Sequence, residues 1–145
     1  MIMSEITEFR SREGIVTCNA RDIYLFVTNM ENFRQFIPVD TISGWVSDAD
    51  SCRFEVNSIG SVNIKLAEKE PYSRVVYDGE ALRNNSFSIH LDIRGTDEES
   101  SATGLVLKAE MDPLMKMIIT KPAEQFLEMM VSEMEKFRGW KQVKE

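Results

Sequence analysis

The chain is poor in the residue types that most often carry chemistry. Its 145 residues include two cysteines and one histidine. Cys18 and Cys52 have neither a CxxC nor a zinc-type spacing, so we expect two free thiols. His90 stands alone, and no acidic cluster has ligand spacing, so we predict no metal and no cofactor. A GxSxG nucleophile motif and a glycine-rich phosphate loop are also missing.

Long apolar runs and clustered positive charge are missing too. No run approaches the ~20 apolar residues that cross a bilayer, which predicts no stable membrane insertion. Glu5, Glu8 and Arg10 near the start are unlike a signal peptide, so a cytoplasmic location is expected. The formal net charge of -7, with scattered basic residues, argues against nucleic acid or an anionic membrane surface as the main partner. The length and the lack of a linker predict one domain, residues 1–145.

The stretch from Asp112 to Lys136 predicts one long amphipathic helix. Asp112 can cap the first backbone N–H groups, and Pro113 suits the first helical position. At 100° steps one arc is apolar and rich in methionine and phenylalanine. That arc holds Met115, Ile119, Phe126, Met129, Met130 and Phe137, opposite Glu124, Gln125, Glu128, Ser132 and Glu135. Because methionine adapts to irregular contacts, this arc suits either an ordinary core or the wall of a ligand cavity. Pro122 predicts a bend near Thr120-Lys121, either to wrap the helix around a twisted sheet or to act as a hinge.

In the rest of the chain, the spacing of apolar residues changes from strand-like to helical and back to strand-like. Residues 4–17 predict a strand with a bend at Gly14, and residues 19–29 and 31–36 predict two short helices, stopped by Pro38. From Asp40 to Met111 the period is two, which predicts an antiparallel meander. The six strands expected there cover residues 41–46, 52–56, 62–66, 74–81, 87–94 and 103–111.

The order of the predicted elements and the segment from Ala20 to Pro38 both resemble those of a known superfamily. The segment reads Ala-Arg-Asp-Ile-Tyr, then Asn-Met-Glu-Asn-Phe, then Phe-Ile-Pro. It resembles the opening helix and Phe-Pro stop of the START and Bet v 1-like (SRPBCC) superfamily, which includes polyketide cyclase/dehydrase-like and CoxG-like proteins. The resemblance implies an α+β helix-grip fold, with a curved antiparallel sheet of about seven strands around the C-terminal helix. It also implies that an apolar ligand is gripped between the sheet and that helix.

The strand and helix phases predict which residues would line such a cavity. The predicted lining comprises Phe54, Val56, Ile64, Leu66, Tyr77, Ile89, Leu91, Leu107, Ile119, Phe126, Met130 and Glu133. Core packing uses the same residue types, so both interpretations stay open for this set. Cys52 shares the face of Phe54 and is predicted to be core or cavity lining.

A few polar residues decide between binding and catalysis. Glu133 falls inside the apolar arc, so it is either solvated near the helix end or turned toward the cavity. His90 alternates with Ile89 and Leu91, which places it on the solvent face. Tyr77 and Arg53 can supply polar points, although their strand phase is not set.

We therefore expect a module that binds a hydrophobic or amphipathic small molecule, with no catalytic residues. An enzyme of the cyclase or aromatase kind is the alternative, and it needs Glu133, Tyr77 or His90 aimed inward. A protein-interaction module resembling co-chaperones is a third option, favoured by a filled interior and an exposed apolar patch. An exposed, outward-facing Trp45 would favour that option or a homodimer.

Overall fold

The computed structural model describes residues 5–37, 42–56, 60–81 and 85–140. The predicted stop at Pro38, the start of the strand expected at residue 41, and parts of the turns expected at residues 57–61 and 84–85 lie outside these ranges. Within them the chain forms an antiparallel sheet with a long C-terminal helix, as predicted.

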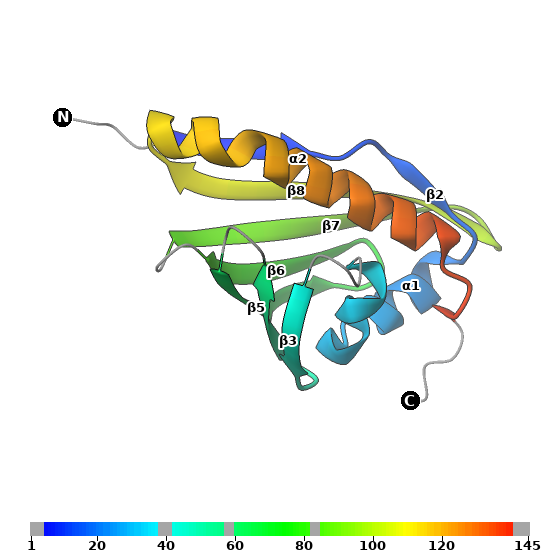
Figure 1. The fold of residues 1–145 in the computed structure, drawn as a ribbon. Coiled ribbons are helices and arrows are strands. Elements are labelled where there is room, and N and C mark those ends of the chain that lie inside the picture. The colour runs from blue at the N-terminus through cyan, green and yellow to red at the C-terminus, as the bar shows by residue number, and fades with distance from the viewer. Residues whose placement is uncertain (1–4, 38–41, 57–59, 82–84, 141–145) are drawn as a thin grey trace.

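The elements follow one another in the expected order (Figure 1). They are β1 (Glu5–Arg10), β2 (Gly14–Val16), α1 (Ala20–Val27), η1 (a 3₁₀ helix, Met30–Phe36), β3 (Ile42–Ser47), β4 (Ser51–Val56), β5 (Gly60–Glu70), β6 (Arg74–Ala81), β7 (Asn85–Asp97), β8 (Ser100–Met111) and α2 (Pro113–Lys136). The strand order in the sheet is β1-β8-β7-β6-β5-β4-β3, and β2 pairs with β8 next to β1. Every pair of neighbouring strands is antiparallel.

The first strand was predicted as one element and is in fact two. Both β1 and β2 pair with β8, and residues 11–13 leave the ladder between them. There the backbone N–H of Leu105 donates to Ser11 Oγ, while the backbone N–H of Arg12 donates to Glu128 of α2. The Ser11 N–H still donates to the Leu105 carbonyl at 2.9 Å, but the regular ladder stops there because side-chain oxygens of Ser11 and Glu128 accept the N–H groups of Leu105 and Arg12. This break raises the strand count of the described chain to eight, against the seven expected.

The helices cover one face of the sheet, called the inner face below. α2 packs on β8, β2 and β1 and touches η1, whereas α1 packs on β6 and β7 at one end of the sheet (Figure 1). The cap of α2 is as predicted, because Asp112 Oδ1 accepts from the N–H of Met115 at 2.8 Å. At the start of α1, Asn19 Oδ1 accepts from the N–H of Asp22 at 2.8 Å. The open side of the sheet faces away from these helices.

The buried face of α2 differs from the predicted arc. The buried residues of α2 are Ala123, Leu127, Met130, Val131 and Met134. Met129, predicted to point inward, is 38% exposed. The helical wheel assumed one contact direction for all 24 residues of α2. In the structure the buried side chains of α2 begin at Ala123, whereas Met115 and Ile119 in the first turns are only partly buried. The helix continues through Pro122, whose side chain is exposed.

The outward direction considered for Trp45 is also wrong. The register of β3 against β4 shifts between Ser43 and Val46, and Gly44 has a φ of 63°. Such a bulge re-aims the following side chain. The Trp45 ring therefore stacks on Phe54 on the inner face, with 5.6 Å between ring centroids and an interplanar angle of 16°. It gives no support to an exposed interaction surface at this position.

Candidate functional site

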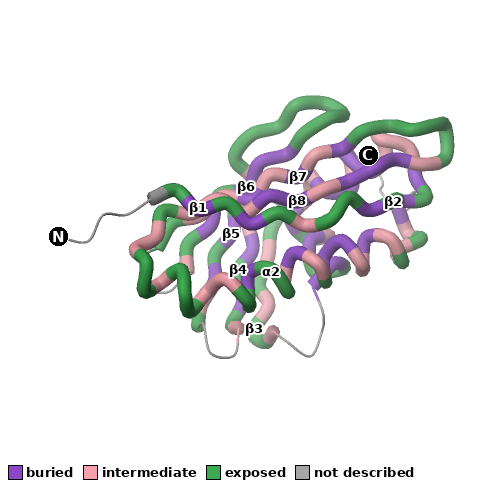
Figure 2. Tube along the Cα trace, turned by 90° about the horizontal axis from the view of Figure 1, so that it is seen from above, coloured by how far each residue is buried: buried purple, intermediate pink, exposed green. Residues whose placement is uncertain are grey.

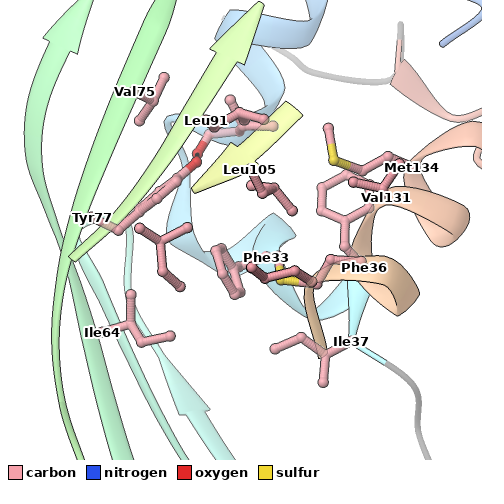
Figure 3. Close-up of a cluster of buried hydrophobic side chains, with 14 of the residues drawn as sticks. Phe33, Phe36, Ile37, Ile64, Val75, Tyr77, Leu91, Leu105, Val131 and Met134 are labelled. Atoms are coloured by element: carbon pink, nitrogen blue, oxygen red, sulfur yellow. Dashed lines mark hydrogen bonds between the residues drawn. The ribbon is translucent and has the colours of Figure 1, made fainter. Parts of the chain in front are cut away.

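The interior between the sheet and α2 is filled at the end where α1 and η1 lie. Figure 3 shows Phe33 and Phe36 of η1, with Ile37 just after it, reaching between the strands and α2. All three are at most 4% exposed. A packed 3₁₀ helix thus occupies the space that a ligand would need, and this closed end of the grip is a core.

Tyr77 belongs to this closed end. Its ring is 2% exposed and lies edge-on to Phe33, and its hydroxyl donates to the backbone carbonyl of Val27 at 2.8 Å. Burial raises the pKa of Tyr77 well above its usual range. The hydroxyl therefore ties β6 to the end of α1 and is not a free polar point for a ligand.

Toward the opposite end of the interior, nine apolar side chains that pack against the core are only partly buried. We call these nine residues the open-end set. They are Ile42, Val56, Leu66, Ala81, Phe87, Leu107, Met111, Ile119 and Phe126. Leu66 and Leu107 adjoin the closed end, because they are the cross-strand partners of Tyr77 and Ile89. Strands β3 to β8 and the middle of α2 contribute them. Since α2 packs mainly against the β1, β2 and β8 side of the sheet, it leaves this end incompletely covered. The open-end set is the candidate functional site.

The predicted lining divides into three groups. Six residues lie in the filled core, namely Phe54, Ile64, Tyr77, Ile89, Leu91 and Met130. Five belong to the open-end set, namely Val56, Leu66, Leu107, Ile119 and Phe126. Glu133 lies apart from both groups, and ligand contact stays a prediction for all twelve.

Four members of the open-end set were missed by the sequence reasoning. Ile42, Ala81, Phe87 and Met111 were absent from the predicted lining. The signal was present in the alternation, because Phe87 has the phase of Ile89 and Met111 has the phase of Leu107. What the alternation could not show is which end of each strand the helices leave open.

The other polar candidates do not face this site. His90 lies on the outer face of β7, as predicted, with its Nε2 3.1 Å from Ser88 Oγ. Partial burial and then the nearby Lys108 lower the pKa of His90. Glu133 was placed inside the apolar arc, but its side chain is 38% exposed and its carboxylate lies 3.9 Å from Lys136 Nζ. Arg53 is exposed.

Neither Cys18 nor Cys52 forms a disulfide, as predicted, and both side chains are buried. Burial raises the pKa of the Cys52 thiol to about 12, which leaves it protonated at neutral pH. In the described ranges, no three His, Cys, Asp or Glu side chains gather as a metal site. No helix among these residues is long and apolar enough to cross a membrane.

Two hollows on the described part of the chain stand out, and neither lies under α2. The larger, of about 920 Å³, is an open trough over β1 and β3 to β8. The outward-facing side chains along it are mostly polar, among them Arg53, Lys65, Asp78 and Lys108. The smaller, of about 540 Å³, lies at the C-terminal end of α2 beside Gln35 of η1. A saddle-shaped twist accounts for the first hollow, because a twisted sheet is concave along one diagonal of each face.

Comparison with known proteins gives structural matches only. No family model matches the chain, and a search of curated proteins by sequence finds no match. A point mutant of norcoclaurine synthase from Thalictrum flavum superposes with a TM-score of 0.73 at 10% identity, covering 94% of this chain and 96% of that one. A conserved protein from Geobacillus kaustophilus has a TM-score of 0.65 at 7% identity, covering 90% and 93%.

A third structure agrees with these two. It is a protein from Deinococcus radiodurans, with a TM-score of 0.59 at 14% identity, covering 90% of this chain and 95% of that one. Coverage is nearly complete on both sides in all three comparisons, so the whole chain takes part in the match. Identities this low establish the fold alone. The chain has the Bet v 1-like helix-grip fold.

Proposed function

We propose that this protein binds a hydrophobic or amphipathic small molecule at the open end of the grip, without catalysis of its own. The open-end set carries the proposal. It gathers apolar side chains of the sheet and of α2 around one end of the interior and leaves them partly exposed. A ligand that covers these side chains gains about 25 cal/mol for each Å² of apolar surface removed from water.

The composition of the set supports an apolar ligand. Phe87 and Phe126 offer ring faces, and Met111 offers a flexible side chain, all of them half-buried. Small-molecule sites are mostly lined by such side chains, with few polar groups. The fold adds support, because norcoclaurine synthase from Thalictrum flavum, with a TM-score of 0.68, is known in complex with dopamine and hydroxybenzaldehyde. Small aromatic molecules are therefore the first ligands to try.

The synthase neighbours also suggest an enzymatic alternative. A cyclase or aromatase would need an ionizable group aimed at the bound molecule. Tyr77 donates to a backbone carbonyl, His90 lies on the outer face, and Glu133 is half-exposed beside Lys136. None of these three candidates supports that reaction, so binding is the function proposed.

Native mass spectrometry on the purified protein, with a thermal-shift screen, tests the proposal. The screen contains fatty acids, sterols, aromatic polyketides and simple phenols. We expect a co-purifying adduct, or a ligand that raises the melting temperature by mass action. A clean mass with no shift from any ligand would overturn the binding function and favour a partner-binding role.

Variants then locate the site. Leu107→Ser and Ile119→Ser each remove an apolar contact from the open end, and we expect each to weaken binding about fivefold, or roughly 1 kcal/mol. Val46→Ser is the matched control, because Val46 is apolar and 67% exposed but faces outward on β3. Equal affinity in all three variants would show that the ligand binds elsewhere.

A further inference from the structure

Strand β7 places a serine and the only histidine of the chain beside each other on the outer face of the sheet. Ser88 and His90 alternate with the buried Ile89 and Leu91, and Figure 2 shows this alternation of intermediate and buried residues along β7, between β6 and β8. The Oγ atom of Ser88 lies 3.1 Å from Nε2 of His90. A hydroxyl group and a basic nitrogen within hydrogen-bonding distance are the arrangement that activates a serine nucleophile.

His90 has the protonation state that this activation needs. Partial burial, followed by the positive charges of Lys108 on β8 and Arg74 on β6, lowers its pKa below the ordinary value of 6.5. Asp92 on β7 and Glu68 on β5 act in the opposite direction without reversing the shift. The imidazole is therefore mostly neutral at pH 7. In the tautomer with its proton on Nδ1, Nε2 accepts the hydrogen bond of the serine hydroxyl and is the atom that takes its proton.

Two charged groups on the same face stabilise the charges that form when the serine attacks a carbonyl carbon. Asp92 occupies the next outward position of β7 and is held by Arg74, whose Nε donates to it at 2.8 Å. Its negative charge favours the imidazolium that forms as the proton arrives. Lys108 is the cross-strand partner of Ser88, so its positive charge stands beside the oxyanion that develops on the attacked carbonyl group.

A small molecule has room to reach the serine from solvent. Ser88 and Lys108 both line the open hollow of about 920 Å³ over the outer face. Each of the two residues is only half-buried, so the hydroxyl is accessible without any movement of the sheet. The proposed binding function makes no use of this hollow.

We propose that Ser88 is a site of covalent acylation by small activated esters. Oγ attacks the carbonyl carbon of the ester, its proton passes to Nε2 of His90, and the bond from the carbonyl carbon to the leaving oxygen breaks. The leaving phenolate takes the proton from the imidazolium, so the products are an acylated serine and a phenol. The site is separate from the open end, because Phe87 faces the interior and Ser88 faces outward.

Ser86 provides a comparison within the same strand. It lies on the outer face two residues before Ser88, lines the same hollow and is exposed. The single histidine of the chain is bonded to Ser88 instead. If exposure alone decided the reaction, Ser86 would react at least as fast as Ser88.

Reaction of the full chain with p-nitrophenyl acetate tests the proposal. The release of p-nitrophenolate is followed by absorbance, and peptide mass mapping after an acid quench locates the acetyl group. We expect acetylation of Ser88 and not of Ser86. His90→Gln should slow the reaction about 100-fold, because glutamine cannot take the proton. Ser86→Ala is the matched control and should react like the original chain.

The pH dependence adds a readout that a purely structural hydrogen bond would not change. The rate of Ser88 acetylation should follow the neutral fraction of His90, rising with pH and levelling off, with its midpoint below pH 6.5. A rate that keeps rising toward pH 10 would overturn the proposal, because it would indicate attack by a lysine amine or an unassisted alkoxide.

The location of the acetyl group decides the remaining outcomes. Equal labelling of Ser86 and Ser88, acetyl found only on Lys108 or His90, or no acetylation at all would each overturn the proposal. Release of p-nitrophenolate that Ser88→Ala abolishes would support it even if the acetyl group is short-lived. The comparison of Ser86 with Ser88 uses the original chain, so it holds even where a variant is unstable.

Discussion

The ring of Phe87 on β7 lies directly over Gly79, its cross-strand neighbour on β6. A Cβ atom at Gly79 would overlap three carbons of this ring. Only a residue without a side chain lets the ring lie flat against the sheet at this point of the open end. The absence of a side chain at Gly79 thus determines how close the Phe87 ring lies to the sheet backbone, and so where a ligand would contact that ring.

Gly79→Ala should displace the Phe87 ring toward the open end. We expect a loss of about 1–3 kcal/mol in the free energy of unfolding, the usual cost of overpacking. Urea unfolding followed by circular dichroism measures it. Gly104→Ala is the control, since a Cβ there meets no atom within 4 Å.

A double-mutant cycle makes this prediction specific. In a Phe87→Ala background the cost of Gly79→Ala should largely disappear, because the overlapping ring is gone. An equal cost in both backgrounds would show that the backbone, and not the ring, requires glycine at this position.

Tyr77→Phe should destabilise the protein by about 1–3 kcal/mol. The substitution removes the hydroxyl that donates to the Val27 carbonyl and leaves that carbonyl without this donor inside the core. Thermal and urea unfolding measure the loss, and Tyr72→Phe serves as the control because Tyr72 is 46% exposed. A neutral Tyr77→Phe would mean that the bond contributes no net stability.

Glu135 should give a pH-dependent contribution to stability. Its Oε1 accepts from Arg12 at 2.6 Å and its Oε2 accepts from the N–H of Ile15 at 3.0 Å, so the break between β1 and β2 is tied to α2. The hydrogen bond from Arg12 lowers the pKa of Glu135 below its ordinary value of 4.5. Because the folded-state pKa is the lower one, this stabilisation is present above pH 4.5 and is lost as the pH falls through the native pKa.

Glu135→Gln therefore should cost more at neutral pH than in acid. We expect a difference below about 1 kcal/mol at pH 7, since the pair is partly exposed. Chemical unfolding of both proteins across the acid range measures the difference, which should shrink as the pH falls. Glu98→Gln, in an exposed turn, is the control, and a difference that stays constant with pH would contradict the ionic origin.

The thiol of Cys52 should resist alkylation in the native protein. It is 3% exposed, and burial raises its pKa to about 12, so the thiolate is scarce at pH 8. Labelling by iodoacetamide, followed by mass spectrometry, should be slow without denaturant and should modify both cysteines in guanidinium. Rapid native labelling of Cys52 would show that the open end admits small molecules deeper than the structure indicates.

Local patterns in the sequence were enough for most elements. The alternation from Phe87 to Ile93 predicted the inner and outer faces of β7, including the outward His90. Asp112 followed by Pro113 predicted the start of α2, because capping and proline geometry depend on adjacent residues. The strand at residues 74–81 was predicted with the bounds that the structure has.

The errors occurred where distant segments compete for the same groups. Trp45 turns inward because a bulge at Gly44 resets its phase against β4. The chain leaves the sheet after β1 because Glu128 of α2 accepts a backbone bond from Arg12. The buried face of α2 was misplaced because the helix is buried only from Ala123 onward, where it packs against other elements of the fold. The hydrophobic periodicity of a segment does not show which distant segments will pack or hydrogen-bond with it.

The sequence by itself determined the order of the elements, the faces of the regular strands, and the scarcity of catalytic side chains, because these depend on residue types and on local spacing. Only the tertiary structure decided which apolar residues are core and which line the open end. Phe54 and Phe87 look alike in an alternating strand, yet one is 1% exposed under a bulged neighbour and the other lies at an uncovered strand end. Burial depends on what packs above a residue, and that neighbour comes from elsewhere in the chain.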